Sequence, residues 1–86
     1  PVWCGGMVET GIGRAANAAL AALPGFTLPG DISASTRFYA QDIVTDPITI
    51  VDGHVTVPIT PGMGFDIDRD VLESVTTSTL VVELDR

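Results

Sequence analysis

The sequence predicts an α/β segment in which a strand, a glycine-rich loop and an apolar helix precede a longer run that contains a β-hairpin. Three observations lead to this fold class. Residues 2–4 form an apolar run typical of a buried strand, and residues 14–23 are almost entirely Ala and Leu. The third observation is two alternating apolar and polar runs, at 48–51 and 54–57, joined by Asp52-Gly53.

The first element is the strand at 2–4, which we expect to be buried on both faces. Gly5-Gly6 then lets the backbone turn or approach a ligand closely. Residues 7–13 read as a glycine-containing loop, and Thr10 within it is a candidate cap for the helix that follows. This arrangement places a glycine-containing loop between a buried strand and a helix.

The helix expected over residues 14–23 consists mainly of the two best helix-forming residue types. Its polar residues, Arg14 and Asn17, lie on one edge, and Pro24-Gly25 ends it. Because its other sides are apolar, we expect it to be buried on more than one side. The rest of an 86-residue chain could hardly cover it and also build a core of its own.

The second part of the chain is expected to contain short strands and turns. Residues 26–28 are predicted to form a strand that ends at Pro29-Gly30, and residues 31–47 an irregular crossing segment. Asp52-Gly53 between two alternating runs is the strongest short-range signal for a hairpin.

The last part is expected to hold one turn, one helix and one strand. Residues 61–64 form the turn, and Asp68 or Asp70 caps a short helix that ends near Val75. Residues 80–84 are predicted to form a last strand.

The charge balance is acidic, with eleven Asp and Glu against four basic residues and a formal net charge of −7. All four basic residues are Arg, so the chain contains no Lys. Nucleic-acid affinity rests on neutralising phosphates with basic side chains. We therefore predict no nucleic-acid partner.

The single cysteine, Cys4, fits a reducing compartment, because it cannot form an internal disulfide. No apolar run approaches the roughly 18–20 residues of a membrane span, and the first residues lack a signal-peptide pattern. We therefore predict a cytoplasmic protein without a membrane partner. The apolar opening after Pro1, without an initiator Met, favours a processed or truncated start.

Two motifs fail on inspection. Residues 11–16 fit a dinucleotide-binding G-x-G-x-x-A pattern, but six residues separate it from Cys4, whereas the pattern should follow its strand directly. Asp66, Asp68 and Asp70 suggest a calcium loop, which would need Gly and Glu where this chain has Val71 and Thr77. An acidic helix start explains the three aspartates better.

Among single residues, Glu9 is the strongest candidate for a catalytic or binding role. It lies just past a predicted strand, in a glycine-rich loop at a helix entrance, and functional residues of β/α enzymes gather at the C-terminal ends of strands. His54 has no second His or Cys at ligand spacing, and Cys4 has no adjacent basic residue that would lower its pKa. Both are weaker candidates.

Residues 3–17 (WCGGMVETGIGRAAN) resemble the eighth barrel strand and following helix of the N-acylamino acid racemases and o-succinylbenzoate synthases. These belong to the muconate-lactonizing-enzyme-like subgroup of the enolase superfamily. The similarity continues through residues 26–35, 37–39 and 61–64, in the family's order.

The resemblance implies the C-terminal part of a modified (β/α) barrel, with an α+β capping domain elsewhere in the same protein. Residues 1–30 would be the last barrel strand and its helix. Residues 31–86 would be a return segment, including the hairpin, that packs against the capping domain. The remaining barrel, the capping domain and a homo-oligomer are the implied partners.

The implied chemistry is abstraction of a proton alpha to a carboxylate, leading to racemisation of N-acylamino acids or dehydration to o-succinylbenzoate. Both reactions stay open at this point. The family uses a divalent metal, usually Mg²⁺, and two lysines from other strands. Since this segment has no Lys and lacks the family's metal-binding carboxylates, we predict no catalytic residue and no metal ligand in it, and no activity on its own.

The resemblance also implies that the segment supplies part of the wall of a pocket for a small carboxylate substrate. The predicted substrate-binding residues are Gly6, Met7, Val8, Glu9 and Phe38. Gly6 would matter because the missing side chain leaves the pocket open. An alternative reading is a self-contained small acidic interaction domain without enzymatic activity, which rests on the chain length and the hairpin.

Overall fold

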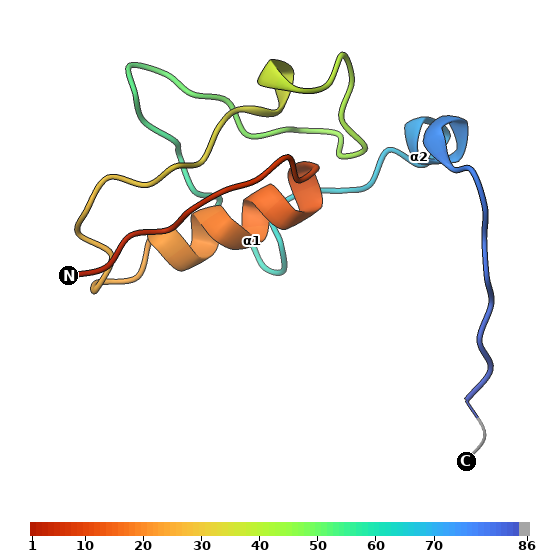
Figure 1. Cartoon of the computed structure of the whole chain (residues 1–86), viewed down its shortest axis with the longest axis horizontal. Coiled ribbons are helices and arrows are strands. Elements are labelled where there is room, and N and C mark those ends of the chain that lie inside the picture. Colours follow the sequence, from red (N-terminus) through yellow and green to blue (C-terminus); the bar gives the residue numbers. More distant parts are fainter. Residues whose placement is uncertain (85–86) are drawn as a thin grey trace.

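The computed structural model describes residues 1–84 and contains three helical elements. They are α1 (Gly11–Ala21), the single 3₁₀ turn η1 (Ser35–Arg37) and α2 (Arg69–Val75). In Figure 1 the N-terminal residues run alongside α1, the middle of the chain loops over it, and α2 leads into a tail that runs away from the rest. Within residues 1–84, β-pairing consists of isolated bridges at Val2–Phe26, Val44–Ile67 and Val51–His54.

Helix α1 starts at Gly11, three residues before the predicted start, and ends at Ala21 rather than at residue 23. Thr10 occupies the N-cap position, as predicted, but its side chain makes no capping hydrogen bond. The cap comes instead from Asp42, whose Oδ1 accepts a hydrogen bond of 2.9 Å from the N–H of Gly11. A partner 31 residues away cannot be read from the local sequence.

Asp42 is a buried carboxylate surrounded by donors. It accepts hydrogen bonds from the Ser35 hydroxyl and from the N–H of Ile43, the latter at 2.7 Å. Burial alone would raise the pKa of Asp42, but the hydrogen bonds from Ser35 and from the backbone N–H groups of Gly11, Ile43 and Val44 hold this pKa below its ordinary value. The negative charge at the start of α1 also suits the helix dipole.

Glycine is required at position 11 because the return segment lies against the helix start. A Cβ at Gly11 would overlap Cγ2 of Val44 and lie 3.0 Å from Oδ2 of Asp42. Residues 42–44 therefore pack directly on the first turn of α1.

Arg14 is fully buried, which corrects the expectation that it lies on a polar edge of the helix. Its Nη2 donates to the carbonyl oxygen of Glu9 at 2.6 Å, and its Nη1 donates to the carbonyl of Ser33. In the described part of the chain, its Nε has no hydrogen-bond partner. Arg14 thus joins α1 to the loop before it and to the return segment, because a buried cation needs acceptors around it.

The predicted strands at 2–4 and 26–28 are reduced to one parallel bridge between Val2 and Phe26. The bridge is held by hydrogen bonds from Val2 to Gly25 and from Leu28 to Val2, of 3.1 and 3.3 Å. Only Cys4 is buried in the first run, whereas Val2 and Trp3 are about half exposed. A strand needs neighbours on both sides to be buried, and within residues 1–84 this run has one β-bridge and one further backbone hydrogen bond, from Asp31 to Cys4.

The Asp-Gly turn forms as predicted, but its flanking strands do not. Asp52 and Gly53 have φ values of 50° and 72°, the geometry of a tight hairpin turn. Val51 and His54 exchange two hydrogen bonds of 2.9 Å, and the pairing stops there. A two-stranded ribbon is marginal without a third strand or a helix to pack on.

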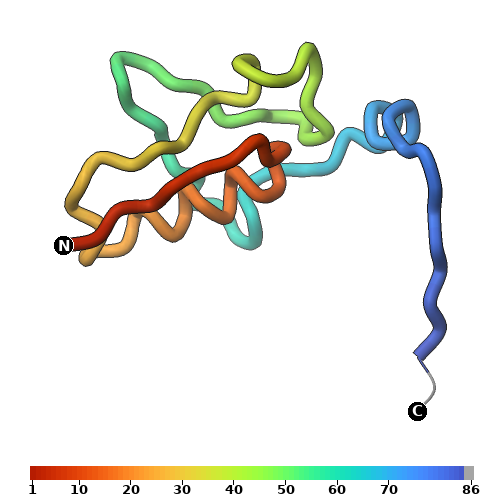
Figure 2. The backbone as a smooth tube through the Cα atoms, in the orientation of Figure 1, coloured from red at the N-terminus to blue at the C-terminus, as the bar shows by residue number. Residues whose placement is uncertain are grey.

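Helix α2 is capped by Asp68, one of the two predicted candidates, which accepts a hydrogen bond of 3.2 Å from Val71. No residue of α2 is buried. The predicted strand at 80–84 is wrong for this structure, because these residues extend along the tail without a pairing partner (Figure 2).

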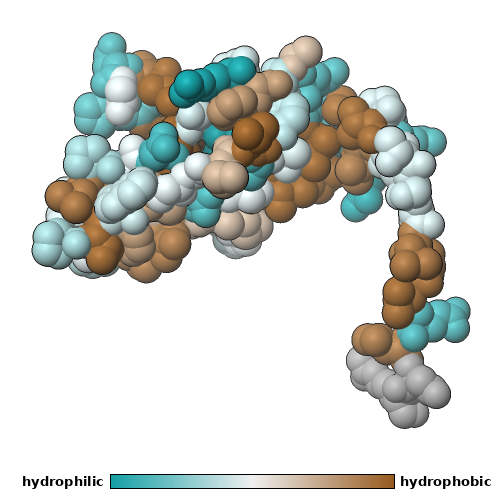
Figure 3. Space-filling model, viewed as in Figure 1, coloured by the Kyte–Doolittle hydropathy of each residue, from teal (hydrophilic) through white to brown (hydrophobic). Residues whose placement is uncertain are grey.

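Much apolar surface is left uncovered. The chain exposes 6755 Å², against about 4,900 Å² for a compact folded protein of this mass, and its radius of gyration is 14.9 Å against about 12 Å. Helix α1 buries one face, while Ile12 and Leu20 on the helix and Leu23 just after it stay exposed. Apolar residues also reach the surface along the tail (Figure 3). We expected α1 to be buried on more than one side, but residues 1–84 cover only one face of it.

Among the described residues, no helix has both the length and the apolar character needed to cross a membrane.

Replacing Asp42 by Asn should lower the free energy of unfolding by about 1–3 kcal/mol, because the start of α1 loses a charged acceptor. The folded-state pKa of Asp42 is depressed below 3.8, so its stabilisation is present above that pH and is lost as the pH falls through the folded-state value. Urea unfolding of the complete polypeptide that carries this segment, between pH 2 and pH 7, measures both effects. Asp46→Asn, at an exposed position, is the matched control, and equal losses in the two variants would contradict the capping role.

Candidate functional site

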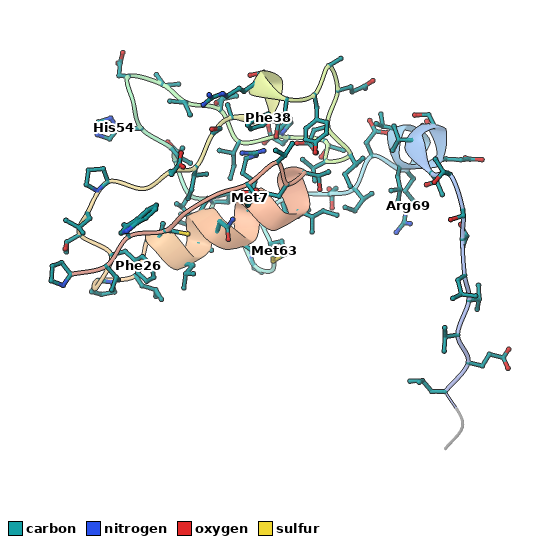
Figure 4. The ribbon with its side chains drawn as sticks, viewed as in Figure 1. Met7, Phe26, Phe38, His54, Met63 and Arg69 are labelled. Carbon is teal, nitrogen blue, oxygen red and sulfur yellow. The ribbon has the colours of Figure 1, made fainter. Side chains whose placement is uncertain are left out.

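A cavity of about 290 Å³ opens beside the loop that precedes α1. Four of the five predicted substrate-binding residues line it, and they come from two separate segments. Met7 and Phe38 lie over the same part of α1, away from Arg69 on α2 (Figure 4). The lining residues are Gly6, Met7, Val8, Asp31, Ser33, Arg37 and Phe38.

Backbone contacts hold the two segments together. The N–H of Asp31 donates to the carbonyl of Cys4 at 2.8 Å, and the Tyr39 hydroxyl donates to the carbonyl of Val8. A Cβ added at Gly6 would overlap the carbonyl oxygen of Asp31. Glycine is therefore required at position 6 because two backbones approach each other closely there. This steric reason adds to the open pocket that the resemblance implied.

Glu9, the fifth predicted residue, is not among the residues that line the cavity. Its carboxylate accepts hydrogen bonds from the N–H of Met7 at 2.6 Å and from Nδ2 of Asn17 at 3.0 Å. Burial would raise the pKa of Glu9, but hydrogen bonds from its own backbone, Met7 and Asn17, together with the charge of Arg14, lower this pKa below its ordinary value. The geometry fits a carboxylate that anchors Met7.

Phe38 stands between two cationic groups. The guanidinium carbon of Arg14 lies 5.8 Å from the centroid of its ring, and that of Arg37 lies 5.6 Å away. Both distances are within the range of a cation–π interaction. These contacts favour the observed position of the ring, which also borders the cavity.

The weaker candidates stay apart from this cavity. His54 is exposed, and its Nδ1 lies 2.8 Å from the carbonyl oxygen of Asp52. Cys4 is a buried free thiol whose Sγ lies 3.7 Å from the carbonyl oxygen of Asn17. Within residues 1–84, no three His, Cys, Asp or Glu side chains form a group that could hold a metal ion.

Three lining residues, Asp31, Ser33 and Arg37, were not predicted as site residues. All three lie in the stretch 31–47, which has no hydrophobic period, so the sequence does not show which of its side chains face Met7. The short spacing between Ser33, Arg37 and Phe38 was the one available signal, since Phe38 was itself a candidate.

The model of the family described as enolase C-terminal domain-like matches residues 1–71. An N-succinylamino acid racemase from Amycolatopsis sp is 60% identical over 78 residues, which cover 91% of this chain and 21% of that protein. The o-succinylbenzoate synthase of Bacillus subtilis strain 168 is 53% identical over 76 residues, covering 88% of this chain and 20% of the synthase.

Solved structures show the same relationship. A member of the enolase superfamily from Listeria innocua superposes with a TM-score of 0.84 at 53% identity, over 90% of this chain and 21% of that one. The chain thus spans about a fifth of the length of the relatives that it matches.

The family match includes the loop 6–9, helix α1 and Phe38, and it covers 71 of the 86 residues. High sequence identity and a close superposition agree with it. The chain belongs to the enolase C-terminal domain-like family of the enolase superfamily.

Proposed function

We propose that this segment forms one wall of the substrate pocket in a metal-dependent enzyme that removes the proton alpha to a carboxylate. The observation that carries the proposal is the cavity itself, because Gly6, Met7, Val8 and Phe38 border one space although they come from two segments. The relatives named as a racemase of N-succinylamino acids and as a synthase of o-succinylbenzoate support the substrate class. Racemisation and dehydration both fit this wall.

The segment's own contribution is to bind and orient the substrate. Met7, Val8 and Phe38 offer apolar surface to the acyl or succinyl portion and exclude water from one side. Glu9 positions Met7 rather than exchanging protons, since its pKa is lowered and its oxygens are already bonded.

The groups that move the proton are proposed to lie outside this segment, because it contains no Lys. The described residues also offer no ligand set for a metal. We propose that a divalent metal, Mg²⁺, is held by carboxylates of other barrel strands in a cytoplasmic, homo-oligomeric protein. The segment alone is inactive in this proposal.

The uncovered apolar surface fits a place within a larger barrel. We propose that residues 1–30 contribute the last barrel strand and helix, with neighbouring elements covering Ile12, Leu20 and Leu23. Residues 31–86 would pack against the capping domain. The excess exposed area, roughly 1,900 Å² over that of a compact protein of this mass, is as large as a stable protein–protein interface.

The complete polypeptide that carries this segment, supplied with Mg²⁺, should exchange the alpha proton of an N-succinylamino acid for deuterium, or form o-succinylbenzoate. Proton NMR in D₂O follows the exchange, and ultraviolet absorbance follows the aromatic product. The isolated segment should do neither. A complete polypeptide that shows no exchange and no dehydration would rule out the proposed function.

Replacing Glu9 by Ala should destabilise the complete protein by about 1–2 kcal/mol and raise KM, because Met7 and Asn17 lose their acceptor. Thermal unfolding and steady-state kinetics measure the two effects. Glu73→Ala, at an exposed position on α2, is the matched control. A drop in kcat of several orders of magnitude with an unchanged melting temperature would instead assign Glu9 to the chemistry.

The alternative, a self-contained interaction domain, is tested by the isolated 86-residue chain. We expect poor dispersion in its proton NMR spectrum and no cooperative unfolding transition, since so little of its apolar surface is buried. A well-dispersed spectrum with a sharp transition would favour the interaction domain.

A further inference from the structure

We infer that Arg37 is a specificity-determining residue that receives the second carboxylate of a dicarboxylic substrate, such as the free end of an N-succinyl group. This inference rests on the proposed function and deepens it. It assigns the acyl preference of the pocket to one cationic side chain at the edge of the cavity.

Arg37 has the position that such a role needs. It lines the cavity together with Met7 and Phe38, and its side chain is exposed. In the part of the chain that the structure describes, it makes one hydrogen bond, from Nη1 to Oγ of Ser33, at a long 3.4 Å. Most of its guanidinium donors are therefore available to a ligand.

The neighbouring ring pre-orients this guanidinium. Phe38 holds Arg37 at 5.6 Å from its centroid, which restricts a side chain that would otherwise sample many rotamers. A planar guanidinium fixed in this way offers two parallel N–H donors to a carboxylate.

The other cation near the ring cannot play this part. Arg14 is fully buried, and two of its nitrogens are bonded to the carbonyls of Glu9 and Ser33. It adds positive charge near Phe38, whereas Arg37 alone of the two lines the cavity. Asp31 is an exposed carboxylate in the same lining and would repel the second carboxylate of the substrate. The positive charge of Arg37 is therefore needed for the cavity to bind that carboxylate.

The test compares N-succinyl and N-acetyl derivatives of one amino acid, which differ in the distal carboxylate, with the complete polypeptide as enzyme. Arg37→Gln should lower kcat/KM for the N-succinyl substrate by roughly 10- to 100-fold, mainly through KM, the loss expected for a hydrogen bond to a charged group. For the N-acetyl substrate, kcat/KM should change by less than about threefold. Arg37→Lys should recover part of the loss.

Arg69→Gln is the matched control, because it removes the same charge from a position on α2 that does not line the cavity and lies away from Phe38 (Figure 4). This variant should leave kcat/KM unchanged for both substrates. Equal losses for the two substrates in Arg37→Gln, or no loss for either, would overturn the inference.

The unmodified enzyme provides a second measurement that needs no variant. Added salt should raise KM for the N-succinyl substrate more than for the N-acetyl one, since the ion pair at the cavity edge is screened. Equal salt dependence would also overturn the inference. An unmodified enzyme that turns over neither substrate and forms no o-succinylbenzoate would instead count against the proposed function, so the two failures can be distinguished.

Discussion

The hydrogen bond from the N–H of Gly11 to the carboxylate of Asp42, at the start of α1, is the contact on which the rest of this structure depends. It fixes the first residue of the helix, and it brings the return segment onto that residue so closely that only glycine fits there. The Ser35 hydroxyl donates a hydrogen bond to the same carboxylate. This bond positions the start of η1 and, through it, Phe38 at the end of that turn. One side of the candidate pocket is thus positioned by a helix cap that lies outside it.

Arg14 complements this contact from within the helix. Its bonds to the carbonyls of Glu9 and Ser33 hold the loop before α1 beside the return segment, and these are the two stretches that border the cavity. The buried core is small, with Cys4, Ala15, Ala18 and Val44 as its apolar members. A polar network therefore organises the segment, while most of its apolar burial is left to surfaces beyond it.

Features that depend on neighbours in sequence could be predicted, and those that depend on distant partners could not. The Ala-rich helix, the Asp-Gly turn and the cap at Asp68 each follow from a few adjacent residues, and all three are present. The strand at 80–84 needs a pairing partner that residues 1–84 do not provide, and the cap at Asp42 joins residues far apart in the chain. Family resemblance pointed to four of the cavity residues, but the aperiodic stretch around Arg37 gave no sign that its side chain lies beside Met7.

The tail has a practical consequence for anyone who produces this segment by itself. Residues 80–84 read Leu-Val-Val-Glu-Leu, and Leu80, Val81 and Leu84 are each at least 80% exposed. A run rich in β-branched residues, without proline and with one charge, is the kind of sequence that stacks into intermolecular sheets. Expressed apart from a covering partner, the segment would be prone to aggregation, with Glu83 as its sole gatekeeper within that run.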